Sequence, residues 1–296
     1  MSEDSTQPRV RLEYPADGVA RVVLARPAKL NAQDRRMLHE LDDAYQRAVR
    51  DEAVRVVVLA ADGEDFSSGH DLDVERAFDM DGVTPRTLTG GFDAPGAEGW
   101  YATEEEVFLG LCLRWRELPR PLIAQVQGRA IGGALELIWP CDLIVAADDT
   151  VFLDPTSAFG AAAAEYFVHP WELGHRRAKE MLFTGEPIGA RDAQALGMVN
   201  RVVPRAELEA ETLALAQRIA ARPQFGIRLA KRAVNRALDL QGMRSAVEST
   251  FDTHHLAHAH NRERFGGLVD PAGAAIIRAD AQRGRPDHTS DRSDHP

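Results

Sequence analysis

The stretch GRAIGGALELIWPCD, residues 128–142, places two adjacent glycines and one carboxylate in an otherwise apolar segment. Glycine lets another group approach the backbone closely, and a helix that begins at Gly132-Gly133 directs its free N–H groups outward. Such an N–H can stabilise a developing negative oxygen, and Glu136, about one turn later, can move a proton nearby. Taken alone, the segment also fits a simpler interpretation, in which the acid complements the helix dipole and the glycines allow close packing.

The stretch FSSGHDL, residues 66–72, offers the same chemistry at the end of another buried strand. It bends at Gly69, and the backbone N–H of His70 supplies a second donor. Two N–H donors from two strand ends form an oxyanion hole, in which the loss of one donor costs about 10²–10³ in rate. We assign this role to the backbone of His70 alone and expect its imidazole to cap or pack the loop.

Hydrophobic periodicity predicts an α/β core around these two loops. Apolar runs predict strands, helical spacings predict helices, and the Gly-, Asp- and Pro-rich residues 77–102 predict a mobile loop or lid. A capping box predicts that a helix starts at Thr103. The expected strands lie in 9–25 (a hairpin), 54–61, 121–128, 143–147 and 151–155; the expected helices lie in 34–50, 103–118, the Gly-Gly segment, 171–183, 191–197, 206–222, 227–238 and 243–265.

The element order suggests four regions. Residues 1–8 are a flexible N-terminus, and residues 9–204 form an α/β core that carries the site. Residues 205–268 contain only predicted helices and form a C-terminal helical module. Residues 269–296 are a tail that is largely disordered from about residue 284, where core-forming residues are lacking.

Composition limits the classes of function. The chain has 296 residues, of which 44% are hydrophobic, and a formal net charge of −11. This charge disfavours a nucleic-acid partner, and no run approaches the roughly 18 apolar residues of a membrane span. The polar N-terminus is no secretory signal, and Cys112 and Cys141 lie in apolar segments. We therefore expect reduced cysteines and a cytoplasmic protein that handles small molecules.

Four stretches together resemble the crotonase superfamily of enoyl-CoA hydratases and isomerases: ARPAKLNA (25–32), FSSGHDL (66–72), GRAIGGALEL (128–137) and LFTGEPIGARDAQALGMVNRVVP (182–204). The resemblance covers roughly residues 10–268. It implies an α/β fold, a crotonase-type spiral of ββα units with a C-terminal helical trimerisation module. It also implies a homotrimer or a dimer of trimers that acts on acyl-CoA thioesters in fatty acid metabolism. Coenzyme A would be part of the substrate, with no separate cofactor, no metal, no nucleic acid and no membrane.

The resemblance also assigns site residues. The thioester oxygen would bind between the backbone N–H groups of His70 and Gly133, and Glu136 matches one of the two catalytic glutamates of the hydratases. Residues that match the binding path of coenzyme A and the thioester are Ala28, Lys29, Leu30, Ser68, Gly69, His70, Leu72, Gly132 and Gly133.

One position departs from the hydratase pattern. The second glutamate is replaced by Thr156 in FLDPTSAFG, and threonine is no acid or base near pH 7. Asp154 and Glu165 are the nearby acids that can compensate, and AEYF (164–167) is expected to add Tyr166 and Phe167 to the pocket wall. We therefore expect an enoyl-CoA hydratase, with isomerase, decarboxylase, dehalogenase or C–C hydrolase chemistry as alternatives. A non-catalytic CoA-ester or RNA-binding protein is less favoured, because Glu136 is retained and the chain is acidic.

Two further patterns in the last third have simpler explanations. His254 and His258 in HHLAHAH have the spacing of two zinc ligands on one helix, but the sequence reveals no third ligand. We therefore expect a solvated or interface helix face at this position. The basic segment IRLAKRAVNRAL, residues 227–238, is expected to be solvated or to face another subunit.

Overall fold

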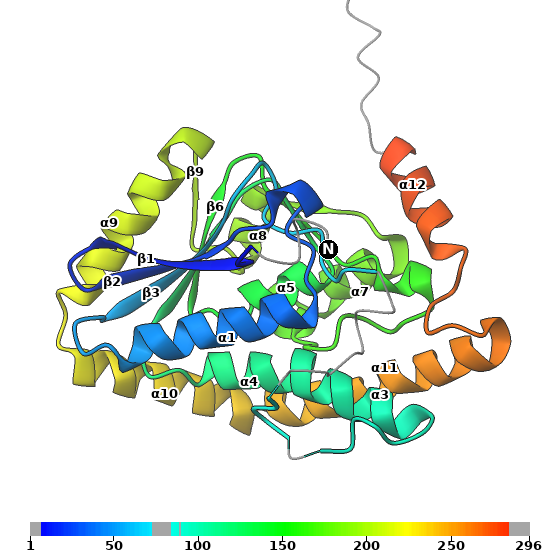
Figure 1. Cartoon of the computed structure of the whole chain (residues 1–296). Helices are drawn as coiled ribbons and strands as arrows, with labels where there is room; N and C mark the ends of the chain where they lie inside the picture. Colours follow the sequence, from blue (N-terminus) through cyan, green and yellow to red (C-terminus); the bar gives the residue numbers. More distant parts are fainter. Residues whose placement is uncertain (1–6, 73–83, 89, 284–296) are drawn as a thin grey trace, which may run out of the picture.

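The computed structural model describes residues 7–72, 84–88 and 90–283. A six-stranded sheet runs through its centre (Figure 1). β1 and β2 form the predicted antiparallel hairpin, and the remaining neighbours are parallel. In spatial order the strands are β1 (Val10–Ala16), β2 (Val19–Leu24), β3 (Val56–Ala61), β4 (Leu122–Val126), β6 (Leu143–Ala147) and β9 (Arg201–Val203).

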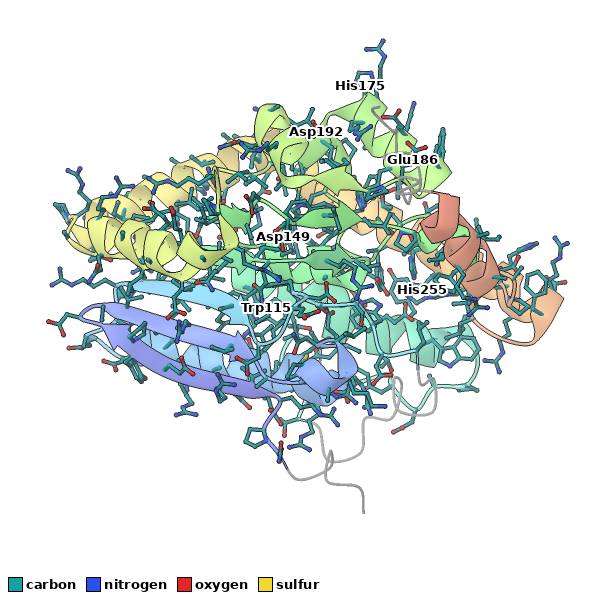
Figure 2. All side chains as sticks on the ribbon, turned by 90° about the horizontal axis from the view of Figure 1, so that it is seen from above. Trp115, Asp149, His175, Glu186, Asp192 and His255 are labelled. Atoms are coloured by element: carbon teal, nitrogen blue, oxygen red, sulfur yellow. The ribbon has the colours of Figure 1, made fainter. Side chains whose placement is uncertain are left out.

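Helices cover both faces of this sheet. On one face, α9 (Leu208–Ala220) packs its buried Leu215 and Ala216 against valines and isoleucines of the strands. On the other face lie α1 (Arg35–Arg50), α4 (Leu111–Arg116) and α5 (Gly133–Ile138), with Trp115 inside this part of the core (Figure 2). Because both faces are buried, the strands read as continuous apolar runs rather than as alternating ones.

A second, three-stranded sheet positions the Gly-Gly segment. It contains β5 (Arg129–Ile131), β7 (Val151–Leu153) and β8 (Ile188–Gly189), and β5 pairs in parallel with β7. The N–H of Gly132 donates to the carbonyl oxygen of Leu153 at 2.7 Å. This register places Gly133 beside the turn that contains Pro155 and Thr156.

The remaining helical elements surround the two sheets. They are η2 (Pro27–Lys29), α3 (Ala97–Glu104), the π-helical η3 (Glu105–Gly110), η4 (Thr156–Phe159), α6 (His169–Leu173), α7 (His175–Thr184), α8 (Ala190–Leu196), η5 (Arg205–Glu207), α10 (Gln224–Leu240), α11 (Met243–Phe265) and α12 (Gly273–Arg283). None of the helices in the part of the chain that the structure describes is long and apolar enough to cross a membrane.

Two expected helix boundaries are wrong, and one helix was not expected. The helix expected from Thr103 begins at Ala97, because Thr103 lies inside a helical turn, where its hydroxyl donates to the carbonyl oxygen of Gly99 at 2.8 Å. Gly174, with φ of +72°, divides the expected helix 171–183 into α6 and α7. The expected tail contains α12, which sequence periodicity did not indicate.

The expectations for the terminal regions, the lid and the division at residue 204 stay predictions, whereas the structure describes both cysteines. Residues 1–6, 73–83, 89 and 284–296 lie outside the described residues, and with them most of the expected flexible N-terminus, part of the expected lid and the end of the tail. The division at residue 204 stays a prediction. Cys112 is buried and Cys141 half-buried, and both are free thiols.

Candidate active site

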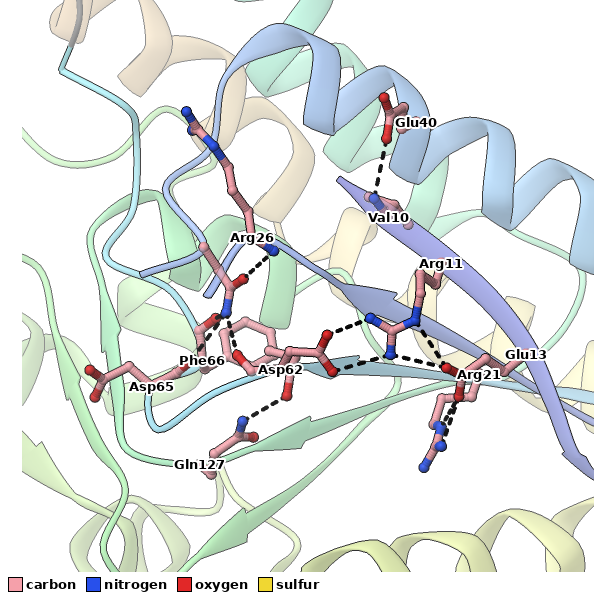
Figure 3. Close-up of polar contacts among 12 residues, drawn as sticks. Val10, Arg11, Glu13, Arg21, Arg26, Glu40, Asp62, Asp65, Phe66 and Gln127 are labelled. Carbon is pink, nitrogen blue, oxygen red and sulfur yellow. Dashed lines mark hydrogen bonds and ion pairs between the residues drawn. The ribbon is translucent and has the colours of Figure 1, made fainter. Parts of the chain in front are cut away.

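A buried asparagine, Asn31, connects the loops that build the site, and Figure 3 labels its partners Arg26, Asp62 and Phe66. Asn31 adopts a left-handed conformation, with φ of +51°, and its side chain points into the protein. Its Nδ2 donates to the carbonyl oxygens of Asp62 and Phe66 at 2.8 and 3.1 Å, and its Oδ1 accepts from the N–H of Arg26 at 2.9 Å. These bonds fix the segment after β3 against the segment after β2, and so position the loop that carries Gly69 and His70.

The two glycine loops meet backbone to backbone. A Cβ atom on Gly69 would lie 2.5 Å from the carbonyl oxygen of Ile131 and 3.1 Å from the nitrogen of Gly133, so no side chain fits at this position. Among the described residues, neither the N–H of His70 nor that of Gly133 donates a hydrogen bond to another protein group. The two N–H groups that the sequence assigned to an oxyanion hole are therefore brought together and available.

A cavity of about 520 Å³ opens beside these two glycines. Its wall includes six of the residues predicted to bind substrate: Ser68, Gly69, His70, Leu72, Gly132 and Gly133. Ala28, Lys29 and Leu30 lie outside this wall and are exposed, although the Leu30 carbonyl accepts from the N–H of Ser68 at 2.9 Å. Phe108, Phe159 and Ile277 are among the apolar side chains that complete the wall.

Glu136 is only 1% exposed and is not part of the cavity wall; it lies behind His70, which lines the cavity. Its Oε1 accepts a hydrogen bond from the N–H of Tyr166 at 2.8 Å, and its Oε2 lies 3.1 Å from Nε2 of His70. Burial alone would raise the pKa of this carboxyl, but the hydrogen bond and charge of His70 outweigh burial and lower the pKa. Glu136 is therefore a carboxylate that is ready to accept a proton.

Glu165 is the second carboxyl group of the site. It is 4% exposed, and one of its oxygens lies within 4.8 Å of the facing atoms of His70 and Glu136. Burial, followed by the negative charge of Glu136, raises its pKa well above the usual range of a glutamic acid. The pair therefore contains one ionised and one protonated carboxyl, an arrangement typical of acid–base catalysis.

The His70 imidazole packs, as expected, and it also lies close to two acids that the sequence did not indicate as its partners. The ring does not merely cap its loop but lies between the two acids, with Nδ1 3.8 Å from Oε1 of Glu165. It stacks on Phe108, with ring centroids 4.1 Å apart. These partners come from distant segments, so no local pattern around His70 could indicate them.

Asp154 and Thr156 form a structural network rather than a proton-transfer pair. The Asp154 carboxylate is buried and accepts from the N–H and hydroxyl of Thr156 at 3.0 and 2.6 Å, and it lies 2.7 Å from Nε2 of His169. Burial opposes ionisation, but these hydrogen bonds prevail and lower the pKa of Asp154 to about 2. Thr156 lines the cavity, while Asp154 is no part of its wall.

Two predicted wall residues are placed elsewhere. Tyr166 is buried in the main core, and Phe167 stacks on His169, with ring centroids 4.9 Å apart. Neither lines the cavity, because the chain turns inward after Glu165. The cavity wall includes His254 and His258 instead.

Of the solvated or interface helix face expected at His254 and His258, the solvated alternative is wrong, and the interface alternative stays a prediction. Both imidazoles are buried, and both lie within 4 Å of the carboxylate of Glu104. Sequence reasoning missed Glu104, because Glu104 in α3 and His254 in α11 are 150 positions apart in the chain and only folding brings them together.

Comparisons with known proteins agree with this geometry. The family model described as enoyl-CoA hydratase/isomerase matches residues 15–268. The Mycobacterium tuberculosis protein named "Putative enoyl-CoA hydratase EchA13" is 42% identical over 277 residues, which cover 90% of this chain and 87% of that protein. An Arthrobacter protein named 4-chlorobenzoyl coenzyme A dehalogenase-2 is 31% identical over 209 residues, covering 70% and 71% of the two chains.

Solved structures confirm the predicted fold class. A crystal structure of a probable enoyl-CoA hydratase from Mycobacterium smegmatis matches with a TM-score of 0.80 and 43% identity, covering 89% of this chain and all of that one. A monofunctional enoyl-CoA isomerase from M. smegmatis matches with a TM-score of 0.62 and 31% identity, covering 80% and 99% of the two chains. The chain belongs to the enoyl-CoA hydratase/isomerase family of the crotonase superfamily and is an enzyme of the hydratase/isomerase type.

Proposed function

We propose that the enzyme adds water across the Cα–Cβ double bond of a 2-enoyl-CoA. The observation that carries this proposal is the pair Glu136 and Glu165, whose pKa values are shifted in opposite directions beside two free backbone N–H groups. Hydration needs one group that takes a proton from water and one that gives a proton to carbon. Glu165 thus supplies the acid that the hydratase pattern lacks at Thr156.

The substrate is placed by its thioester group. Its carbonyl oxygen accepts hydrogen bonds from the N–H groups of His70 and Gly133, and the acyl chain extends into the cavity. The nucleotide end of coenzyme A runs over Ala28–Leu30 and Ser68–Leu72, where Lys29 pairs with a phosphate. We propose no separate cofactor, because coenzyme A is part of the substrate.

The reaction proceeds through an enolate. Glu136 removes a proton from water while the water oxygen bonds to Cβ, and the π electrons move to the thioester oxygen. The two N–H donors stabilise that negative oxygen, typically lowering the barrier by about 3–4 kcal/mol per donor. When the carbonyl re-forms, Cα takes the proton of Glu165, which gives a 3-hydroxyacyl-CoA and leaves Glu136 protonated and Glu165 ionised.

The two glutamates then exchange the remaining proton. Their oxygens lie within 4.8 Å of each other, with the His70 imidazole between them, so the proton passes from Glu136 back to Glu165. This step restores the starting state without a separate proton carrier.

The test is a panel of enoyl-CoA esters incubated with the enzyme, with mass spectrometry for the gain of water. Glu165→Gln should slow hydration by about 10²–10⁴-fold, the typical contribution of a positioned acid. The matched control is Glu186→Gln, because Glu186 is exposed (Figure 2) and should leave the rate unchanged. Introducing Thr156→Glu into the Glu165→Gln enzyme should restore part of the hydration rate, since it returns an acid to the position of the hydratase glutamate.

Isomerisation is the second candidate, because a single base can carry a proton between two carbons. One of the similar solved structures is an enoyl-CoA isomerase. Two results together would favour isomerisation over hydration. The wild-type enzyme would add no water, and the Glu165→Gln variant would convert 3-enoyl-CoA to 2-enoyl-CoA at full rate.

We further propose a homotrimer or a dimer of trimers, in the cytoplasm, acting in fatty acid metabolism. The exposed apolar side chains of α10, among them Phe225, Leu229 and Val234, support a subunit interface on this helix. Sedimentation analysis of the wild type and of Leu229→Asp tests it: the wild type should sediment as a trimer or hexamer, and the variant as smaller species.

A further inference from the structure

A second polar cluster lies in the wall of the same cavity and has no part in the proposed hydration. It consists of Glu104 from α3 and His254, His255 and His258 from α11, all of them buried. Figure 2 shows His255 toward the end of the molecule that holds α12. Buried ionisable groups need partners that offset their charges and lone pairs, so the contacts within the cluster indicate what it binds.

Backbone carbonyl groups orient two of these imidazoles. Nδ1 of His254 lies 2.7 Å from the carbonyl oxygen of Ala163, and Nδ1 of His258 lies 2.8 Å from that of Leu268. A carbonyl oxygen only accepts hydrogen bonds, so each Nδ1 carries a hydrogen and donates it. In the neutral rings, each Nε2 therefore has a free lone pair, and zinc-binding histidines commonly have this same hydrogen-bonding pattern.

The two lone pairs converge on one point. Nε2 of His254 and Nε2 of His258 lie 2.8 Å apart, a distance at which two lone pairs repel unless a positive charge lies between or beside them. Glu104 adds a carboxylate, with Oε1 3.4 Å from Nε2 of His258 and Oε2 3.8 Å from Nε2 of His254. Among the described residues, this Oε2 accepts no well-aligned hydrogen bond, although Glu104 is only 2% exposed.

We propose that Glu104, His254 and His258 bind one zinc-class divalent metal ion. Ligand bonds of about 2.0–2.2 Å place the ligand atoms of tetrahedral zinc roughly 3.3 Å apart. The two Nε2 atoms lie 2.8 Å apart, and Glu104 offers a different oxygen to each of them, at 3.4 Å for His258 and 3.8 Å for His254, so these values lie on both sides of about 3.3 Å. Imidazole nitrogens select zinc and its transition-metal neighbours over magnesium and calcium, which prefer oxygen ligands.

The neighbouring residues fit a three-ligand site with one open position. The His255 ring packs against Tyr101 and Phe251, and its Nε2 lies 3.1 Å from Oε2 of Glu104 without forming an aligned hydrogen bond to it. The cavity wall includes all three ligands and Glu165, so the fourth position of the ion faces the cavity. Glu165 is not one of the three ligands, but its Oε1 lies 3.6 Å from Nε2 of His254, so a bound ion would lower the pKa of this acid and slow the proposed hydration. Zinc binding itself is measured without substrate, so its outcome is independent of the proposed hydration.

The short contact between the two Nε2 atoms has a competing explanation, which is a proton shared by the two imidazoles. A direct measurement of metal binding distinguishes the two explanations. The full-length enzyme, treated with a chelator and dialysed, is titrated with zinc chloride in a calorimeter. We expect one equivalent of zinc to bind with saturation. Cobalt(II) in place of zinc should give the strong visible absorption of a four-coordinate ion.

Variants locate the ion. His258→Gln and Glu104→Gln should weaken zinc binding by roughly 100-fold or more, because loss of an outer partner of a ligand already costs 10–100-fold. The control is His260→Gln, an exposed histidine of the same helix, which should leave binding unchanged. Zinc should raise the melting temperature of the wild type and of His260→Gln, but not that of His258→Gln.

Several results would overturn the site. They are the absence of a saturable equivalent of zinc, zinc affinity that survives His258→Gln, and a cobalt spectrum of a six-coordinate aqueous ion. If the variants do not fold, X-ray absorption at the zinc edge of the zinc-loaded wild type tests the site. The proposal requires two imidazole ligands, and a spectrum without them would overturn it.

Discussion

Nε2 of His70 and Oε2 of Glu136 lie 3.1 Å apart, and the imidazole that makes this contact rests on the backbone of Gly133. A Cβ atom on Gly133 would lie 2.3 Å from Cδ2 of that ring. One histidine thus carries a backbone N–H of the proposed oxyanion hole and a side chain that contacts the proposed catalytic carboxylate. The glycine is required because the imidazole occupies the space of its missing side chain.

Gly133→Val should leave the protein folded but lower turnover of a short enoyl-CoA by about 10²–10³-fold, the cost of one lost oxyanion donor. The valine displaces the His70 ring and holds the thioester oxygen away from the amide. Gly189→Val is the matched control, because no atom lies within 4 Å of a Cβ at Gly189. Circular dichroism checks the fold, and a fully active Gly133→Val enzyme would refute the oxyanion hole.

Glu136→Gln should abolish both turnover and deuterium exchange at Cα, with a loss of about 10²–10⁴-fold. The amide keeps the shape and the contact with the N–H of Tyr166, but it cannot accept a proton. Exchange of Cα hydrogens in D₂O, followed by mass spectrometry, measures this directly. Retention of most of the activity would mean that Glu136 only complements the helix dipole.

The rate of hydration should depend on pH through both acids. The pKa of Glu136 is lowered, so activity is lost only as pH falls through that lowered value. The pKa of Glu165 is raised, so its proton is available at lower pH, and activity is lost as pH rises through that raised value. In Glu165→Gln, kcat should be low and its alkaline limb should disappear. An unchanged alkaline limb in this variant would assign the limb to another group.

Asp154→Asn should destabilise the fold by about 2 kcal/mol at pH 7, which corresponds to the lowering of its pKa. A depressed pKa means that this stabilisation is present above pH 3.8 and is lost as pH falls toward about 2. Urea unfolding of wild type and variant should therefore converge at low pH. Asp148→Asn, at an exposed position, is the control and should change the unfolding free energy by less than about 0.5 kcal/mol.

Local patterns predicted most of the fold. The strands were predictable because burial on both faces gives them unbroken apolar runs, as in β6, whose bounds were predicted without error. The helix start at Ala97 was missed, because its N-cap is Gly96 and has no side-chain hydrogen bond, whereas Thr103 carries a strong capping signal inside the helix. α12 was missed because Gly273 and several alanines give it little periodicity.

Sequence reasoning could predict the backbone N–H groups of the site but not the contacts between its side chains. The N–H groups of His70 and Gly133 follow from glycine positions at strand ends, which are local features. The imidazole of His70, the raised pKa of Glu165 and the contact between Glu104 and His258 all arise between segments that are distant in the chain. A single sequence does not reveal which distant residues come into contact. It could therefore identify Glu165 as a candidate acid but not the residues that shift its pKa.

The segment that follows residue 268, including α12, completes one side of the cavity wall. Val269, Ala274 and Ile277 line the acyl cavity, yet they follow residue 268, where the match to the family ends. The proposed oxyanion hole and both acids lie before that residue, within the range that the family model matches. We therefore expect substitutions at Ala274 and Ile277 to change the length of acyl chain that the cavity admits while the proposed acids and N–H donors stay in place.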